Sequence, residues 1–421
     1  MAVIKFRNPY GIFSPDDDYD DGEFDEEDSG QSFIDEELED SENVWKRRRE
    51  ILRLLLHAAG ITAAMGALLA LVLFLASQRV YSGASTSVVK EMSMQEDTSC
   101  ATLGSNIVYY TRDGASCLSP KGKLIWSISY EMQQPLVSQA GDVLAIGDYN
   151  GSVIYLQNAA GTLGSVNTNM PIQALAVSES GEVAAVLSDT DVVWVYLFDS
   201  SGNTIAYFKT TMSQSGYPIS VSVSPSGELV CVSHLLATGN GLSSSIAFYN
   251  FGDVGQNVAE NNVSGFNYDN EIFPVTAFLS DSVCAAVSDS RIAFFNGKQI
   301  PQSGNNAMFS QELKGVYAGD AYIGLLFMNE GAEAQDTLQI YDASGTVVGS
   351  ITLSEDYTDI QIAGKAVYAS NDTSLAIYSV EGKKRYEGDF DQEVRSIIPR
   401  RDTISKLYLA VEDGIEQMTL R

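Results

Sequence analysis

The chain has 421 residues, and its 55 Asp and Glu outnumber 25 Lys and Arg to give a formal net charge of −30. A charge this negative repels a phosphate backbone, which argues against binding to DNA or RNA. Two histidines leave almost no material for histidine-dependent catalysis or for a zinc site built on several imidazoles.

The chain begins with an acidic segment, residues 1–44, in which 16 Asp and Glu face only Lys5 and Arg7. Such a segment repels itself and cannot bury a core, so we expect a disordered cytosolic tail. Aromatic and aliphatic side chains lie between the acidic residues, and two interpretations stay open. The tail is either a solvated spacer or a linear docking peptide that folds when it binds a partner.

An apolar segment, residues 54–78, follows a basic juxtamembrane segment, residues 45–53. The apolar segment carries no formally charged side chain unless His57 is protonated. As a helix it would span about 37 Å, more than the ~30 Å hydrocarbon core of a bilayer, and we predict a transmembrane helix over 54–78. The alternative is a cleaved signal peptide, whose apolar core would be only about 7 to 15 residues long and would lie close to the start.

Basic residues before this segment set the predicted orientation. They are Lys46, Arg47, Arg48, Arg49 and Arg53, against Arg79 and Lys90 at a similar distance after it. Flanking Lys and Arg stay preferentially on the cytoplasmic side of a membrane. We therefore predict a single-pass protein of the cell membrane with a cytoplasmic N-terminus and an extracytoplasmic C-terminal domain.

All four cysteines, Cys100, Cys117, Cys231 and Cys284, fall in this exported part. Outside the cytosol one or two disulfides are allowed, and Cys100 with Cys117 is the candidate pair. The alternative is that the thiols are free and buried, as cysteines often are.

From residue 98 onward the sequence predicts an all-β domain, because short alternating strands recur between turns of Gly, Asn, Asp and Ser. One pattern returns seven times: a strand ends on a large apolar residue, and a short polar turn closes on glycine. The mean spacing of these glycines is about 43 residues, the length of a four-stranded propeller blade. The closing glycines are Gly122, Gly161, Gly202, Gly252, Gly297, Gly345 and Gly382.

The end of the sequence holds three strands of an eighth unit, at 394–398, 407–411 and 415–420. The unassigned apolar stretch 86–92, within a linker over 79–97, is the candidate for the fourth strand. A ring closed by both ends of the chain has no open sheet edge, which is a physical reason for this arrangement. We predict a β-propeller of eight four-stranded blades over 98–421, with seven blades as the alternative.

Two segments resemble the repeat of quinoprotein-like propellers, the PQQ-like relatives of WD40 propellers. Residues 117–127 hold a turn, then Gly-Lys, two apolar residues and Trp126, and residues 141–152 carry Asp and Asn beside Gly. The whole layout also resembles uncharacterised bacterial single-pass membrane proteins with a domain of unknown function. The first resemblance implies a cofactor held by a tryptophan platform, a catalytic aspartate and calcium, but no position here takes those roles. The second implies no activity.

No catalytic, cofactor-binding or metal-ligating residue is predicted. The Asp148 and Asp189 segments lack the glycine and glutamate spacing of a calcium loop, and we interpret them as hairpin turns. Cys231 and His234 lie three residues apart in a predicted strand, which directs them to opposite faces and disfavours a shared metal.

Binding is then the remaining class of function. The leading hypothesis is a non-catalytic protein-binding or scaffolding propeller of the bacterial cell envelope, anchored in the lipid bilayer through 54–78 and using no cofactor. A quinoprotein-type oxidoreductase is one alternative, and a sensor or assembly factor that signals through the acidic tail is another. Candidate partner loops are the longest departures from the repeat, at 235–245, 252–270 and 328–336.

Overall fold

The computed structural model describes residues 45, 49, 52–69, 79–189, 192–211, 215–239, 241–329, 331 and 335–421. The chain divides into two compact units, Met1–Gln78 and Arg79–Arg421. The predicted acidic tail lies outside the described residues, as do Lys46, Arg47, Arg48 and the last part of the predicted span, 70–78.

The described part of the first unit is dominated by one helix, Leu52–Leu69, which is long and apolar enough to cross a membrane. Every side chain along it is exposed, including Leu54 and Leu68. A helix that is apolar on all sides needs an apolar environment around it. This agrees with the span predicted from the sequence, and its insertion in a membrane stays a prediction.

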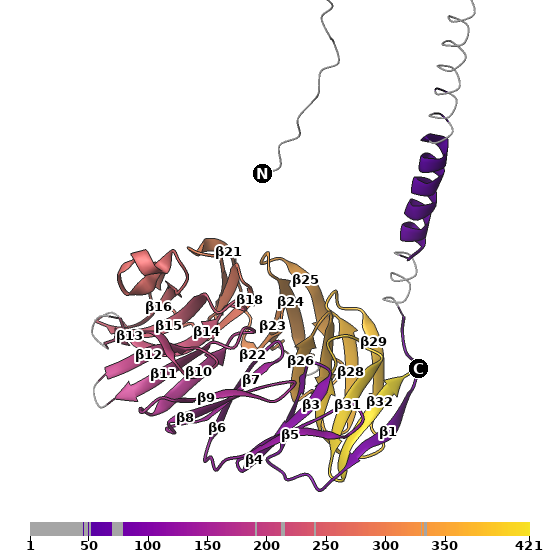
Figure 1. The fold of residues 1–421 in the computed structure, drawn as a ribbon, viewed down its shortest axis with the longest axis horizontal. Coiled ribbons are helices and arrows are strands. Elements are labelled where there is room, and N and C mark those ends of the chain that lie inside the picture. Colours follow the sequence, from indigo (N-terminus) through magenta and orange to yellow (C-terminus); the bar gives the residue numbers. More distant parts are fainter. Residues whose placement is uncertain are drawn as a thin grey trace, which may run out of the picture. The chain divides into compact units, whose positions relative to one another are not determined.

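The second unit is a ring of eight four-stranded antiparallel sheets, an eight-bladed β-propeller (Figure 1). The prediction of eight blades is confirmed, and the seven-bladed alternative is wrong. First strands of neighbouring blades contact each other, as β6 does with β10 and β10 with β14. The first strand of each blade therefore lies at the centre of the ring, and the fourth lies at its outer edge.

Blades 1 to 7 each use four consecutive strands. Blades 1 to 3 are β2 (Ser99–Leu103), β3 (Asn106–Tyr110), β4 (Gly114–Leu118), β5 (Leu124–Ser129); β6 (Pro135–Ala140), β7 (Val143–Asp148), β8 (Val153–Asn158), β9 (Thr162–Asn167); and β10 (Ile172–Val177), β11 (Val183–Asp189), β12 (Val192–Phe198), β13 (Thr204–Thr210). Blade 4 is β14 (Tyr217–Val223), β15 (Leu229–Thr238), β16 (Gly241–Asn250) and β17 (Asn262–Tyr268), with 3-10 helices η1 (Gly255–Asn257) and η2 (Ala259–Asn261) between its last two strands.

The same order continues in the next three blades. Blades 5 to 7 are β18 (Val275–Ser280), β19 (Val283–Val287), β20 (Arg291–Asn296), β21 (Gln302–Met308); β22 (Leu313–Ala318), β23 (Tyr322–Phe327), β24 (Thr337–Asp342), β25 (Val347–Thr352); and β26 (Asp359–Ala363), β27 (Ala366–Ser370), β28 (Ser374–Ser379), β29 (Lys384–Asp389).

The eighth blade, called the closing blade below, takes strands from both ends of the propeller sequence. Its first three strands are β30 (Val394–Pro399), β31 (Lys406–Val411) and β32 (Gly414–Leu420), and its outer strand is β1 (Ala84–Glu91). Figure 1 shows β1 in indigo beside β32 in yellow. The stretch 86–92 that the sequence left unassigned thus falls largely within β1.

The closing glycines of the repeat adopt the positive φ that a tight turn often requires. Six of the seven have a positive φ, and the exception is Gly252. At Gly122 φ is +75°, and a Cβ would lie 2.2 Å from the carbonyl oxygen of Val89 in β1. Only glycine tolerates both the backbone conformation and this close approach. The turn of blade 1 is therefore packed directly against the closing blade.

Neighbouring blades are joined by buried seams. Both faces of a blade are apolar, and all five residues of β27 are buried, as expected for a sheet packed between two others. Trp126 in β5 is buried beside Leu144, and its Nε1 donates a hydrogen bond of 2.9 Å to the carbonyl oxygen of Asn158 in blade 2. The tryptophan that carried the quinoprotein-like resemblance thus fastens one blade to the next.

Candidate functional site

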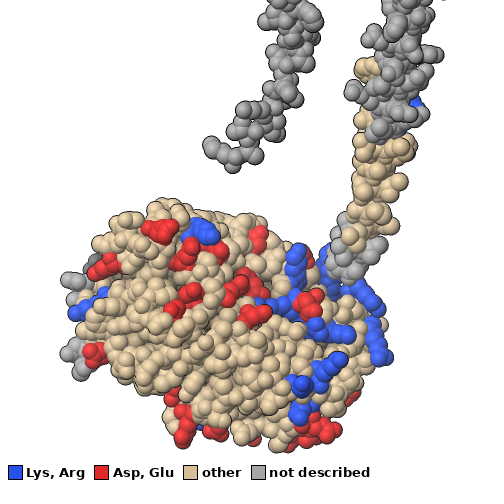
Figure 2. Space-filling view, viewed as in Figure 1, with Lys and Arg blue, Asp and Glu red and all other residues tan. Residues whose placement is uncertain are grey.

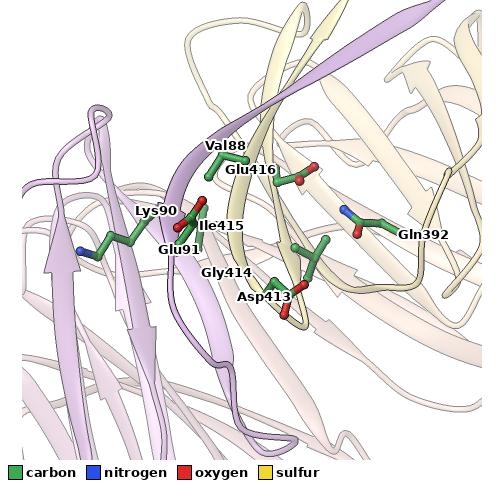
Figure 3. Close-up of a pocket in the computed structure, with 9 residues that line it drawn as sticks. Val88, Lys90, Glu91, Gln392, Asp413, Gly414, Ile415 and Glu416 are labelled. Carbon is green, nitrogen blue, oxygen red and sulfur yellow. The ribbon is translucent and has the colours of Figure 1, made fainter.

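A hollow of about 410 Å³ opens at one end of the closing blade, where β1 ends and β32 begins (Figure 3). Its polar lining is Lys90, Glu91, Gln392, Asp413 and Glu416, beside Val88, Val411, Gly414 and Ile415. Figure 3 shows Lys90 pointing away from the three acidic side chains.

Local backbone features shape this hollow. The pairing of β1 with β32 shifts between Val88 and Lys90, and a bulge of this kind redirects the side chains that follow it. The turn between β31 and β32 closes at Gly414, whose φ is +142°. Beyond the strand, the Met92 N–H donates a hydrogen bond of 3.0 Å to the carbonyl oxygen of Asp413. The segment after β1 is therefore held against the turn that carries the acidic residues.

Two further hollows flank the closing blade. One, about 260 Å³, lies between the segment after β1 and blade 1, and its lining includes Gln95, Thr98 and Asp113. The other, about 210 Å³, lies between β29 and β1, and shares Gln392 with the first. All three hollows are lined by β1 or by the residues that follow it, so they depend on the closure of the ring.

The rim around these hollows is acidic. Exposed carboxylates come from the loop before β30 and from the β31–β32 turn, and they are Asp391, Glu393, Glu412 and Asp413. The nearby guanidinium of Arg395 hydrogen-bonds to the backbone and not to these carboxylates: its Nη1 donates a hydrogen bond of 2.8 Å to the carbonyl oxygen of Met94. Over the described residues no group of three or more His, Cys, Asp or Glu side chains is placed to hold a metal ion. The rim offers hydrogen-bond acceptors and negative charge to a polar or cationic surface.

The candidate disulfide between Cys100 and Cys117 is absent and the alternative of free thiols holds in the structure, where neither cysteine is bonded. Cys100 in β2 pairs with Tyr109 of β3, whereas Cys117 in β4 pairs with Val108. One strand separates them and they point to opposite faces, so their Cα atoms are about 10 Å apart, beyond the reach of a disulfide. Burial raises the pKa of Cys100 to about 12 and that of Cys117 to about 11, which keeps both thiols protonated and unreactive.

The cysteines that the fold does bring together are Cys231 and Cys284. They lie in one buried cluster at the seam between blades 4 and 5, with exposures of 0% and 1%. Burial, followed by a hydrogen bond with Cys284, raises the pKa of Cys231. Spacing in the sequence gave no sign of this contact, because the two residues belong to different blades.

The other residues considered in the sequence fall into structural roles. Asp148 Oδ1 accepts a hydrogen bond of 2.7 Å from the Gln134 N–H, as a turn-stabilising carboxylate does. Cys231 belongs to the blade 4–5 seam, whereas Val232, which shares a strand face with His234, belongs to the blade 3–4 seam. Arg49 and Arg53 are two of the five basic residues from which the membrane orientation was predicted, and both are exposed.

One candidate partner loop has to be corrected. Residues 235–238 and 241–245 belong to two paired strands and not to a loop, because β15 and β16 stay paired until Thr238 meets Gly241. The segment 252–270 holds η1, η2 and β17. Part of the segment 328–336 lies outside the described residues.

Acid is expected to weaken the propeller through His234. This side chain is 2% exposed, its Nε2 has no hydrogen-bond partner among the described residues, and burial lowers its pKa to about 4. An unfolded histidine has a pKa of about 6.5, so below that pH the unfolded chain binds a proton that the folded chain refuses. The free energy of unfolding should fall by about 3 kcal/mol between pH 7 and pH 4 from this group alone.

Urea unfolding at pH 7 and pH 4 of the wild type and of His234→Gln measures this contribution. Other groups titrate in both proteins. The free energy of unfolding should therefore fall more between pH 7 and pH 4 in the wild type than in the variant, and the difference between the two decreases is the contribution of His234. An equal decrease in the two proteins would show that His234 does not cause the acid sensitivity.

These observations define the class of protein: an eight-bladed β-propeller whose last blade is completed by a strand from the N-terminal side. The model of a family of unknown function (DUF5711) matches residues 77–420, and the chain belongs to this family. No curated protein matches the sequence.

Solved structures share the fold at low identity. The computationally designed Ika8 protein matches with a TM-score of 0.55 and 12% identity, over 80% of this chain and 100% of that chain. Sqt1 of Saccharomyces cerevisiae matches with a TM-score of 0.53 and 10% identity, over 82% and 99%. BamB from Moraxella catarrhalis has a TM-score of 0.48 and 12% identity, over 80% and 100%. At these identities the likeness shows the fold alone.

Proposed function

We propose that this protein is a membrane-anchored extracytoplasmic propeller that binds a protein partner in the bacterial cell envelope and performs no catalysis. The observation that carries the proposal is the grouping of three hollows and an acidic rim around the closing blade. Propellers present their variable loops and strand ends on the two faces of a rigid ring, where function is carried. The rim is therefore the proposed contact surface.

The anchoring part of the proposal is supported by the helix Leu52–Leu69. The length of the apolar segment 54–78 favours an uncleaved anchor, and the five basic residues before that segment favour a cytoplasmic N-terminus. The oxidoreductase and sensor alternatives gain no supporting observation from the residues that the structure describes.

Site-specific photo-crosslinking in native membranes tests the contact surface. A photo-reactive amino acid replaces Glu412 in the β31–β32 turn of the closing blade, and Asp289 in the corresponding β19–β20 turn of blade 5 serves as the matched control. Both side chains are exposed. We expect one discrete crosslinked protein at position 412 and none at 289.

Charge reversal completes the test. Asp413→Lys combined with Glu416→Lys should remove the crosslink at position 412 without changing the amount of protein in the membrane. A crosslink of equal strength at both positions, or one indifferent to charge reversal, would contradict a partner site on the rim. Carbonate extraction of the same membranes reports separately on anchoring, because an integral protein stays in the pellet.

A further inference from the structure

Positive charge on this acidic propeller is concentrated on one side. Figure 2 shows Lys and Arg side chains grouped over one side of the ring. Six exposed residues of blade 7, the closing blade and the segment before β1 form what we call the basic sector: Arg79, Lys365, Lys383, Lys384, Lys406 and Arg421. They occupy the ends of the strands opposite to those that carry the acidic rim.

Backbone hydrogen bonds make the basic sector continuous. The Tyr81 N–H donates to the carbonyl oxygen of Arg385 at 2.8 Å, which joins the segment before β1 to the start of β29. The Arg421 N–H donates to the carbonyl oxygen of Gly83 at 2.8 Å, which joins the end of β32 to the same segment. Residues separated by more than 300 positions in the sequence therefore form one surface.

The sign of the charge at one repeated position shows that the basic sector is local. The turn between the first and second strands carries an acidic residue in each of blades 2 to 6: Asp142, Glu179, Glu228, Asp281 and Asp320. The same turn carries Lys365 in blade 7 and Arg400 with Arg401 in the closing blade. The charge of this turn is thus reversed only in the two blades next to the point where the chain joins the ring.

Part of this charge is not neutralised within the protein. Lys384 pairs with Glu387 at 2.6 Å, and Arg400 pairs with Asp402 at 2.6 Å. In contrast, Lys365, Lys406 and Arg421 form no ion pair with another described residue. Glu381 and Asp402 are the acidic side chains in the same connections, and the basic residues outnumber them.

We propose that the basic sector binds the anionic phospholipid headgroups of the membrane that anchors the chain. The inference rests on the proposed anchoring. Arg79 directly follows the predicted span, and Tyr81 is already bonded into the propeller. At no more than about 3.6 Å per residue, the chain from Arg79 to Gly83 extends about 18 Å or less. The basic sector is therefore held close to the headgroups, where clustered Lys and Arg attract anionic lipid.

This contact would also orient the propeller. β1 runs from Ala84 beside the basic sector to Glu91 at the acidic hollow. Eight residues of strand span about 25 Å. With the basic sector on the membrane, the rim proposed to bind a partner faces away from it.

Full-length protein in proteoliposomes provides the test. A donor dye is attached at Thr403→Cys in the β30–β31 connection, and acceptor dyes are placed on lipid headgroups. Vesicles of phosphatidylcholine alone are compared with vesicles that also contain phosphatidylglycerol. We expect energy transfer to rise at least twofold with the anionic lipid, and the rise to disappear in high salt.

Charge-neutralised variants give the matched comparison. Lys365→Gln, Lys383→Gln and Lys406→Gln together should abolish the response to anionic lipid. Arg112→Gln, Lys209→Gln and Lys298→Gln, which remove the same charge from exposed positions elsewhere, should preserve it. Equal transfer in both vesicle types would overturn the inference. Carbonate extraction of the vesicles distinguishes this failure from a failure of anchoring, because only the latter releases the protein.

Discussion

A chain that begins at Thr98 is expected to unfold at a much lower urea concentration than a chain that begins at Arg79. The two chains differ by residues 79–97, and the main element in them is β1, which pairs with β32 at seven positions from Ala84 opposite Leu420 to Glu91 opposite Gly414. At about 1 kcal/mol for each lost hydrogen bond, the truncation should reduce the free energy of unfolding by about 4 to 7 kcal/mol. That is a large fraction of the ~5–15 kcal/mol that stabilises ordinary proteins.

Urea unfolding followed by circular dichroism measures the loss. A permuted chain, in which residues 79–97 follow Arg421, serves as the control, because Arg421 is already hydrogen-bonded to Gly83. The permuted chain should recover most of the stability. If the chain that begins at Thr98 unfolds at the same urea concentration as the one that begins at Arg79, β1 does not close the ring.

The second large effect is expected at the seam between blades 4 and 5. Phe248 is fully buried, and its ring packs against Phe295 at 5.2 Å and edge-on to Phe266 and Phe278 at 6.3 and 6.4 Å between centroids. Phe248→Ala removes these contacts and leaves a cavity between two blades. The expected loss in the free energy of unfolding is about 3–5 kcal/mol.

An exposed aromatic residue gives the matched control. Tyr207 in β13 is 59% exposed, although its ring stacks on Tyr196 at 5.0 Å. Tyr207→Ala should cost less than about 1 kcal/mol, because little apolar surface leaves the core. Denaturant titration of both variants checks the contrast. Similar losses at the two positions would show that the blade 4–5 seam contributes less than its packing indicates.

Most of the fold could be predicted because the repeat is local. Each of blades 1 to 7 carries a glycine in the connection between its third and fourth strands, and the positive φ at six of the seven positions is the physical reason that this residue recurs. The missing fourth strand of the last blade followed from the rule that an open sheet edge has to be covered. β1 is more polar than the apolar stretch that the sequence led us to expect, so its place in the ring was the better guide to it.

The errors came from inferring contacts from sequence spacing. Cys100 and Cys117 are only 17 positions apart, but β3 lies between their strands. Residues 235–245 are rich in Gly and Ser, yet they continue a hairpin, because cross-strand pairing outweighs composition in a sheet. The hollow at the closing blade had no local signal, since Glu91 and Asp413 belong to opposite ends of the propeller sequence.

The closing blade also sets the order in which the molecule is completed during synthesis. β1 is the first strand of the propeller to leave the ribosome, and its partner β32 follows about 320 residues later. At ~5–20 residues per second the first strand waits roughly 15 to 60 s for its neighbour. Six of its eight side chains are exposed and most are polar or charged even in the finished ring, so a waiting β1 presents little apolar surface to neighbouring chains. The strand that is made first and paired last is therefore suited to wait in water.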